Sequence, residues 1–248
     1  MTELTTNTSL VELVDHMGSD LTVVDAARVS FDKKSEWEYE TFTKNGIDIT
    51  GSGKLKKADE KLINFLAREN HWSPFGHAQV QFRITAPVFV ARQLVKHQVG
   101  LVWNEVSRRY VDAPPQFFLP DQWRARHENK KQGSNEEVFV DQIVWQDEDE
   151  GSGTETTLGF VERFYYEAEA VYQTLLKNGV CPEQARMVLP QAMMTSWIWT
   201  GSLMAMARVY GLRAKPDTQL ETRMIAVEIG KHMEKLFPVS WKALTNVE

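Results

Sequence analysis

Residues 78–85 read Ala-Gln-Val-Gln-Phe-Arg-Ile-Thr, so apolar and polar side chains alternate along the whole stretch. Successive side chains of a β-strand point to opposite faces, and an alternating strand therefore has one face on the core and one towards solvent. This arrangement is typical of antiparallel sheets. The stretch predicts a half-buried antiparallel strand with one face on the core.

Both neighbours of this strand have helical signals. Between Lys56 and Asn70, apolar residues recur at the spacing of one helix face. Residues 71–77 contain Pro and Gly, which end that helix. After the strand, Pro87 favours a helix start and predicts a short helix over 88–98.

The C-terminal half is predicted to be mainly helical. Apolar residues between 156 and 178 mark a long amphipathic helix, which Gly179 stops. Further helices are predicted at 182–189, 202–210 and 217–236, the last with Asp217 as its N-cap. The tryptophan and methionine residues of 193–206 are interpreted as core or subunit-interface positions. These helices and the strand at 78–85 agree with an α+β fold.

Three other segments complete the predicted organisation. Residues 21–27, Leu-Thr-Val-Val-Asp-Ala-Ala, are interpreted as a strand of the first core layer. The charged, Gly-rich stretch 32–54 is interpreted as a loop followed by the start of a helix. The polar stretch 124–153 is predicted to be a surface excursion rather than a linker, so the whole chain, 1–248, is predicted to be one domain.

Composition restricts the function classes. The net charge of −6 and the pI near 5.6 disfavour a general nucleic-acid binder, which is usually basic. The single cysteine, Cys181, cannot form an internal disulfide, which suits a reducing compartment. No run approaches the ~18 apolar residues of a membrane span, and the N-terminus lacks a secretory signal. We therefore expect a soluble, cytoplasmic protein with no membrane or nucleic-acid partner.

Residues 92–110 combine four cationic side chains with one His, one Glu and one Ser, in the order Arg-Gln-Leu-Val-Lys-His-Gln-Val-Gly-Leu-Val-Trp-Asn-Glu-Val-Ser-Arg-Arg-Tyr. On a helix over 88–98, Arg92 and Lys96 would share one face, with Gln93 and His97 on the adjoining face. Guanidinium groups form paired, charge-assisted hydrogen bonds to phosphate oxygens. The stretch predicts a site for a small anionic ligand such as a nucleotide.

Two more arginines lie in otherwise apolar segments, Arg186 and Arg213. Taken singly, each is more often a surface or ion-paired group than a ligand. Together with residues 92–110, they place cations on three separated apolar segments. One shared pocket for an anionic ligand is then about as well supported as the alternative that each arginine is a surface or ion-paired group.

Four blocks of the chain form an ordered set of motifs. The central block is Pro-Val-Phe-Val-Ala-Arg-Gln at 87–93, Lys-His-Gln at 96–98 and Asn-Glu-Val-Ser-Arg-Arg-Tyr at 104–110. His-Trp-Ser-Pro-Phe at 71–75 precedes it, and Ala-Arg-Met-Val-Leu-Pro at 185–190 follows, then Leu-Arg at 212–213 and Gln-Leu-Glu at 219–221. Over roughly residues 70–225 the chain resembles the flavin-dependent thymidylate synthases.

This resemblance implies conversion of dUMP to dTMP, with methylenetetrahydrofolate giving the carbon and NADPH reducing a bound FAD. Positions that match dUMP-binding residues of the family are Gln93, Lys96, Glu105, Ser107, Arg108, Arg109, Arg186 and Arg213. Positions that match FAD-binding residues are His71, Ser73, Lys96, His97, Gln98, Glu105, Ser202 and Arg208. Arg213 and Ser107 are the implied catalytic positions, and Arg213 matches an arginine that stabilises the ionised N3 of the pyrimidine.

The family's fold is also implied: a central, largely antiparallel sheet flanked by helices, with a helical C-terminal half. The resemblance further implies a homotetramer whose active sites lie between subunits. The chain departs from the family's Arg-His-Arg motif, because Lys96 and Gln98 replace the two arginines. Lys96 keeps the charge without the bidentate geometry, and Gln98 is neutral. Arg208 stands where many members have Asn, and Asp217 where some have His.

Single residues of these blocks have other possible roles. Ser107 is a nucleophile, a ligand-binding hydroxyl or a cap, and the hydroxyl is favoured because no His–Asp pair is near it in sequence. Cys181 precedes a Pro-initiated helix with no nucleophile motif and is interpreted as a small buried residue. His71 and His77 lack Cys or carboxylate partners at metal spacing, so no metal site is predicted.

Two other functions stay open on the sequence alone. A nucleotide-binding regulator could keep the pocket and have lost turnover through the changes at Lys96 and Gln98. A nucleic-acid-binding module is disfavoured by the acidic balance.

Overall fold

The computed structural model describes residues 4–44, 47–51, 53–111, 113–129, 133–147 and 151–246. Within these residues the central sheet has the strand order β2-β5-β12-β6. It is formed by β2 (Leu10–Met17), β5 (Gln79–Pro87), β12 (Met194–Ser202) and β6 (Leu101–Glu105). Every neighbouring pair is antiparallel, which confirms the predicted α+β fold with a central antiparallel sheet.

Strand β5 lies between β2 and β12, and its alternation has the predicted effect. Val80, Phe82 and Ile84 are buried, whereas Arg83 is exposed. Strand β12 pairs with both β5 and β6 and buries Trp197 and Trp199 on the same core. The interpretation of these tryptophans as core residues is therefore confirmed. The strand that carries them was not predicted from the sequence.

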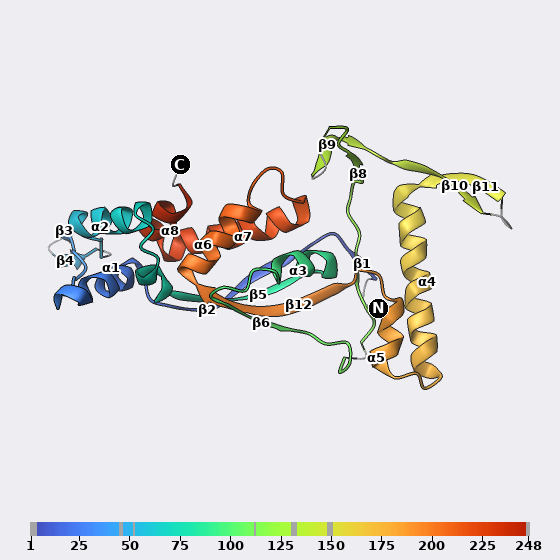
Figure 1. Ribbon diagram of the computed structural model, residues 1–248, viewed down its shortest axis with the longest axis horizontal. Coiled ribbons are helices and arrows are strands. Elements are labelled where there is room, and N and C mark those ends of the chain that lie inside the picture. Colours follow the sequence, from blue (N-terminus) through green and yellow to red (C-terminus); the bar gives the residue numbers. More distant parts are fainter. Residues whose placement is uncertain are drawn as a thin grey trace.

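Helices cover one face of the sheet and occupy both ends of the molecule (Figure 1). Helices α6 (Leu203–Arg213) and α7 (Leu220–Leu236) pack together, α6 against β12 and α7 against β2. At one end lie α1 (Asp20–Arg28), η1 (Val29–Phe31), α2 (Lys57–Arg68) and α8 (Pro238–Thr245). At the other end, α4 (Thr157–Lys177) stands beside α5 (Pro182–Ala185), which continues into the 3-10 turn η3 (Arg186–Val188).

The end formed by α1 and α2 corrects a prediction, because residues 21–27 lie in helix α1 rather than in a strand. The Thr22 hydroxyl accepts a hydrogen bond from the Ser19 N–H at 3.0 Å, and Asp20 accepts from the backbone N–H groups of Val239 and Ser240. These contacts fix the helix start and dock it on α8, so tertiary packing overrides the strand propensity of two adjacent valines.

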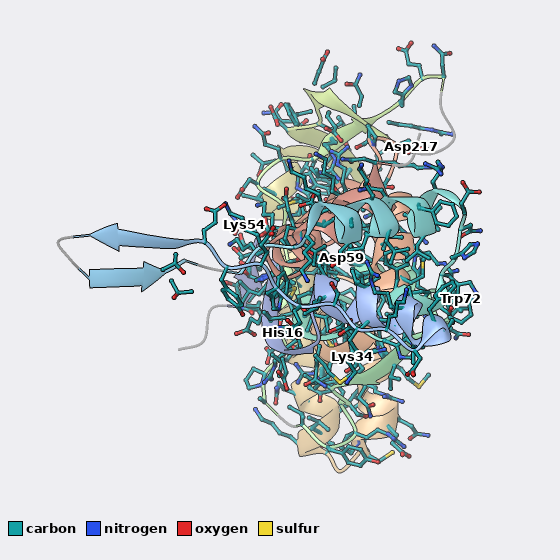
Figure 2. All side chains as sticks on the ribbon, turned by 90° about the vertical axis from the view of Figure 1, so that its left-hand side faces the viewer. His16, Lys34, Lys54, Asp59, Trp72 and Asp217 are labelled. Atoms are coloured by element: carbon teal, nitrogen blue, oxygen red, sulfur yellow. The ribbon has the colours of Figure 1, made fainter. Side chains whose placement is uncertain are left out.

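Seen from this end, the hairpin of β3 (Thr41–Lys44) and β4 (Ile47–Thr50) projects away from α1 and α2, while Trp72 lies at the opposite edge (Figure 2). Residues 32–54, predicted as a loop and a helix start, therefore contain a hairpin, and α2 begins at Lys57. Asp59, on α2, is fully buried and forms an ion pair with Arg28.

Helix α3 (Val88–Leu94) is shorter than predicted. Because it ends at Leu94, Lys96 and His97 lie in the following turn, and the predicted shared faces of Arg92 with Lys96 and of Gln93 with His97 do not form. Gly100 then has a φ of +75° and leads directly into β6. The short 3-10 turn η2 (Ser73–Gly76) precedes β5, as its Pro and Gly predict.

The polar stretch 124–153 forms paired strands, apart from residues 130–132 and 148–150, which lie outside the described residues. Strand β8 (Arg124–Arg126) pairs with β9 (Ser134–Phe139), and β10 (Gln142–Asp147) pairs with β11 (Gly151–Thr156). Figure 1 shows these strands extending beyond the sheet to the start of α4. Strands β1 (Thr5–Thr6) and β7 (Phe117–Phe118) form a further parallel pair.

Two local predictions in the C-terminal half are wrong. Gln219 rather than Asp217 occupies the N-cap of α7, and Asp217 is exposed. Cys181 is an exposed free thiol at the N-cap of α5 rather than a buried residue. The long helix α4 is confirmed, and Gly179 follows it with a φ of +83°. Among the described residues, no helix combines the length and apolar character needed to cross a bilayer.

Candidate active site

A cavity of about 720 Å³ brings together residues from distant parts of the chain. Its lining includes Arg92 from α3, Arg108 from the turn after β6 and Arg186 from η3. In the part of the chain that the structure describes, none of these three guanidinium groups forms an ion pair with a carboxylate. The cavity therefore has an excess of positive charge available to an anionic ligand.

One acidic side chain of this cavity, Glu105, is held in a fixed position. Its Oε1 accepts a hydrogen bond from the Thr195 hydroxyl at 2.9 Å, and its Oε2 accepts from Trp103 Nε1 at 3.1 Å. Thr195 is buried, and the Trp103 ring stacks on Trp197 with centroids 4.4 Å apart. Strands β6 and β12 thus present a rigid hydrogen-bond acceptor beside the cations.

Of the predicted residues in the turn after β6, Arg108 lines the cavity, whereas Ser107 and Arg109 do not. The Ser107 hydroxyl oxygen accepts from the Arg109 N–H and from Arg109 Nε, both at 3.3 Å. Arg108 donates to the carbonyl of Ala113, and Arg109 Nη1 lies 3.9 Å from Glu183 Oε1. The Ser107 oxygen is held by an arginine rather than by a histidine base. These contacts fit a ligand-binding hydroxyl better than an activated nucleophile.

Arg92 was not among the residues predicted to bind a ligand, although it lines the cavity with Arg108 and Arg186. The sequence did indicate it as one of the four cations of 92–110. It was missed because the predicted site residues were taken from the family resemblance, and Arg92 is not one of the positions matched there.

A second group of predicted residues, Arg213 and His97, forms a pair that does not line this cavity. Arg213, at the end of α6, donates from Nε to His97 Nε2 at 2.9 Å. His97 Nε2 is therefore an acceptor, which places the ring proton of the neutral imidazole on Nδ1. Burial, and then the charge of Arg213, lower the pKa of His97 below its ordinary value of 6.5.

This pair predicts a pH dependence of stability. The folded state favours neutral His97, so its contribution to stability is present above pH 6.5 and is lost as pH falls through the lowered pKa. We expect thermal melts of the wild type to decline below that pH more steeply than melts of His97→Gln, whose amide oxygen can accept from Arg213 without titrating. Parallel declines in the two proteins would contradict the assignment.

Gln93, the last residue predicted for the substrate from α3, faces helix α7. Its amide hydrogen-bonds to Gln219, and its Oε1 accepts from the Thr222 hydroxyl at 3.2 Å. The structure therefore gathers Glu105, Arg108 and Arg186 in one cavity. Outside this cavity, Gln93 is bound to the start of α7, and Arg213 of α6 is bound to His97 in the turn after α3.

Comparison with known proteins identifies the family to which these positions belong. Residues 12–239 match the family described as thymidylate synthase complementing protein. A flavin-dependent thymidylate synthase of Thermus thermophilus is 33% identical over 234 residues, which cover 94% of this chain and 74% of the relative. The chain belongs to the flavin-dependent thymidylate synthase family. The Kosmotoga olearia member is also 33% identical, over 95% of this chain and 90% of its own.

Solved structures agree with this membership of the flavin-dependent thymidylate synthase family. A UMP/dUMP methylase from Streptomyces cacaoi, crystallised with 5-Br UMP, superposes with a TM-score of 0.73 at 29% identity. The match covers 97% of this chain and 95% of the methylase. The structure of that methylase with 5-Br dUMP gives the same TM-score and identity. The predicted family is therefore confirmed.

A flavin-dependent thymidylate synthase requires a site for FAD, and most of the residues predicted to form it are exposed. Ser73 begins η2, which packs against α6, and His71 lies two residues before it; both are exposed, as is Arg208 on α6. Lys96 and Gln98 are exposed in the turn after α3. Neither Lys96 nor Arg208 forms an ion pair within the described residues, and their role in binding FAD stays a prediction.

The turn at Gly100 lies close against the start of α6. A Cβ at Gly100 would lie 3.3 Å from the Ala205 Cβ and 3.4 Å from the Ser202 hydroxyl. The Ser202 N–H donates to the Gly100 carbonyl at 3.2 Å, and the buried Ser202 hydroxyl caps α6. Since the Ser202 side chain already has this structural role, its participation in flavin binding stays a prediction.

Cys181 offers a direct test against thiolate catalysis of the kind used by unrelated thymidylate synthases. Its thiol is exposed, and Cys181 does not line the arginine cavity. We expect Cys181→Ala to keep dTMP formation within about twofold of the wild type, as exposed substitutions away from a site usually do. Loss of turnover with unchanged melting would instead make this cysteine a nucleophile.

The described residues contain no cluster of three or more His, Cys, Asp or Glu that could hold a metal.

Proposed function

We propose that this chain is a thymidylate synthase that converts dUMP to dTMP, with methylenetetrahydrofolate as carbon donor and NADPH-reduced FAD as hydride source. The observation that carries the proposal is the cavity with three arginines that form no ion pair within the described residues. It is built from the motif blocks of a family whose members have this activity. A nucleotide substrate is supported by the S. cacaoi methylase, which was crystallised with 5-Br dUMP.

We assign the dUMP phosphate to the arginine cavity. Arg108 and Arg186 are the predicted phosphate ligands there, and Arg92 adds a third cation from α3. Ser107 and the fixed carboxylate of Glu105 give a hydroxyl and an acceptor for the sugar or base. Lys96 and Arg109 are exposed cations at the edge of the same segment and increase its attraction for anions.

Arg213 is the residue that we expect to act on the pyrimidine ring. Carbon 5 of uracil is a weak nucleophile, and negative charge on the ring at N3 increases its electron density. A guanidinium beside N3 stabilises that charge in the transition state. His97 accepts from Arg213 Nε and thereby orients the guanidinium, whose two terminal nitrogens can face the ring. When bound, reduced flavin supplies the hydride that converts the transferred methylene to a methyl group.

The two groups of site residues favour assembly of the active site between copies of the chain. Arg213 and His97 do not line the cavity that holds Arg108 and Arg186. In a homotetramer, the cavity of one copy can meet the Arg213–His97 pair of another, as the family resemblance implies. The single, unpaired cysteine supports the proposed cytoplasmic location.

The test of this function is a flavin spectrum of the purified protein together with dUMP-dependent tritium release from carbon 5. Bound flavin and tritium release that requires NADPH and methylenetetrahydrofolate are the expected results. Protein without flavin and without tritium release would overturn the proposal. Binding of dUMP without NADPH oxidation would identify a nucleotide-binding regulator instead.

A further inference from the structure

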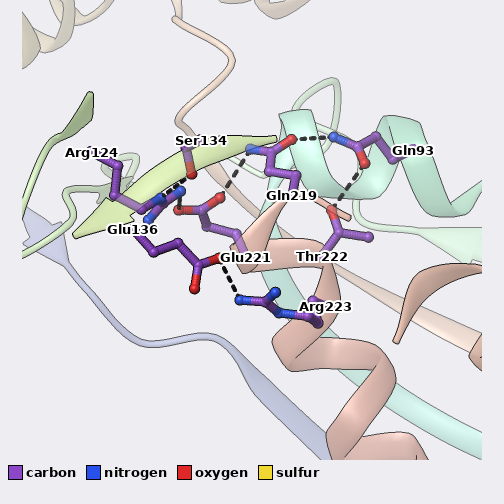
Figure 3. A network of polar contacts seen from close by, with 8 residues as sticks. All are labelled: Gln93, Arg124, Ser134, Glu136, Gln219, Glu221, Thr222 and Arg223. Atoms are coloured by element: carbon purple, nitrogen blue, oxygen red, sulfur yellow. Dashed lines mark hydrogen bonds and ion pairs between the residues drawn. The ribbon is translucent and has the colours of Figure 1, made fainter. Parts of the chain in front are cut away.

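A chain of hydrogen bonds runs from the polar excursion to Gln93 (Figure 3). Arg124, on β8, donates from Nη2 to Glu221 Oε1 at 2.7 Å. Gln219 Nε2 donates to the other oxygen of Glu221 at 3.0 Å. Gln93 then donates from Nε2 to Gln219 Oε1, and Thr222 donates to Gln93 Oε1 at 3.2 Å.

The chain of hydrogen bonds begins at a largely buried ion pair. The side chains of Arg124 and Glu221 are only 17% and 9% exposed. Arg124 Nε also donates to the Ser134 hydroxyl of β9 at 2.8 Å, so its guanidinium is held from both sides. An ion pair with so little exposure is held in one geometry, because moving the two side chains apart would leave a buried charge without compensation.

The direction of every later hydrogen bond follows from Glu221. An ionised carboxylate only accepts, so Gln219 must turn its NH₂ group towards Glu221 and its carbonyl towards Gln93. Gln93 must then turn its own NH₂ group towards Gln219 and its carbonyl towards Thr222. A free glutamine amide can exchange its two ends by a half-turn of the side chain. The carboxylate removes that freedom from both amides.

We propose that Arg124 and Glu221 are positioning residues that fix which end of the Gln93 amide faces the nucleotide. The inference rests on the proposed function and on the family resemblance, which makes Gln93 one of the expected dUMP-binding positions. Gln93 retains one amide hydrogen and one carbonyl lone pair beyond this network, and their positions are set by the carboxylate. The polar stretch 124–153 would thus contribute to substrate recognition, since its strand β8 supplies the arginine that holds Glu221 and so fixes the orientation of the Gln93 amide.

The first test is Glu221→Gln, which keeps the shape of the side chain and removes its acceptor-only character. The new amide can donate to Gln219, which allows the Gln219 and Gln93 amides to reverse. We expect dUMP affinity to fall about tenfold, the effect of one misdirected hydrogen bond on an equilibrium constant. The KM for dUMP should rise by a similar factor, with a smaller change in kcat and unchanged flavin content. Unchanged dUMP affinity would overturn the inference.

The decisive test is the exchange Gln219→Glu with Glu221→Gln. The amide at position 221 can accept from Arg124 and donate to the carboxylate at position 219, which in turn can accept from Gln93. The Gln93 amide then has its wild-type orientation again, although Arg124 still lacks its carboxylate partner. Recovery of dUMP affinity to within about threefold of the wild type supports the positioning role. An exchange variant as weak as Glu221→Gln would show a structural role for the ion pair and overturn the inference.

The matched control is Glu136→Gln. Glu136 lies on β9 and pairs with Arg223 of α7 at 2.6 Å, so it joins the same excursion to the same helix without entering the hydrogen-bond chain (Figure 3). Its dUMP affinity should stay within about twofold of the wild type. An equal loss in Glu136→Gln would attribute the effect to general loosening of the excursion and contradict the inference.

Gln219→Met and Thr222→Val provide a further test should Glu221→Gln fail to fold. Because Glu221 fixes the Gln93 amide through Gln219, Thr222→Val should leave dUMP affinity within about twofold of the wild type, and Gln219→Met, which removes the relaying amide and keeps the ion pair, should weaken it. Unchanged dUMP affinity in Gln219→Met would overturn the inference. Wild-type protein that binds no dUMP would overturn the proposed function and this inference together. Normal turnover by the wild type with unaffected variants would overturn the inference alone.

Discussion

Arg213→Ala is expected to lower dTMP formation by about 10²–10³-fold, the usual cost of removing a group that stabilises developing charge in a transition state. Arg213 ends helix α6 and is oriented by its hydrogen bond to His97. Alanine removes the only part of this residue that can reach a ligand and leaves His97 with an unpaired Nε2. The measurement is dUMP-dependent tritium release from carbon 5, with bound flavin quantified in the same preparation.

Two further variants separate the charge of Arg213 from its geometry. Arg213→Lys keeps the charge but loses the planar guanidinium that hydrogen-bonds to His97 and to the ring. We expect it to recover only part of the activity. Lys215→Ala changes an exposed cation two residues further on and should leave turnover unchanged. Near-normal tritium release by Arg213→Ala would remove Arg213 from catalysis, and a similar defect in Lys215→Ala would assign the effect to nonspecific loss of charge.

Local sequence patterns predicted those parts of the fold that depend on local physics. Alternation over 78–85 predicted β5, and helical periodicity with Gly179 predicted α4 and its end. Strand β6 was missed because residues 101–105, Leu-Val-Trp-Asn-Glu, lie between a glycine turn and a cationic segment and show no alternation of apolar and polar side chains. Helix α1 was missed because the contacts that decide it come from α8, more than 200 residues later in the chain.

The site shows the same division between local and distant information. The cations of 92–110 could be found from one stretch, Arg186 and Arg213 from their apolar surroundings, and the motif resemblance added their expected roles. The separation of Arg186 from Arg213 could not be predicted, because it depends on how α5 and α6 are placed by the sheet and by α4. Nor could the link from Arg124 to Gln93, since a salt bridge between residues 124 and 221 has no sequence signal.

Arg186→Ala is expected to raise the KM for dUMP by about 10–100-fold, because charge-assisted hydrogen bonds contribute about 1.5–3 kcal/mol each. Arg186 lines the cavity on the 3-10 turn η3, and its only hydrogen bond described within the chain is from Nε to the Glu183 carbonyl at 3.4 Å. Its terminal nitrogens are thus available to phosphate, whereas an arginine engaged in an ion pair would have to give up a partner first.

The phosphate assignment makes a more specific prediction than a loss of affinity. If Arg186 binds the phosphate, Arg186→Ala should weaken dUMP strongly and deoxyuridine hardly at all, so the preference for the phosphorylated ligand should shrink. Isothermal titration with both ligands measures this ratio, and raised salt should reduce it in the wild type. Arg163→Ala is the control, since Arg163 is an exposed arginine on α4 already paired with Glu155 at 2.9 Å. Equal weakening of dUMP and deoxyuridine would place Arg186 near the base or sugar, and the phosphate would then fall to Arg92 and Arg108.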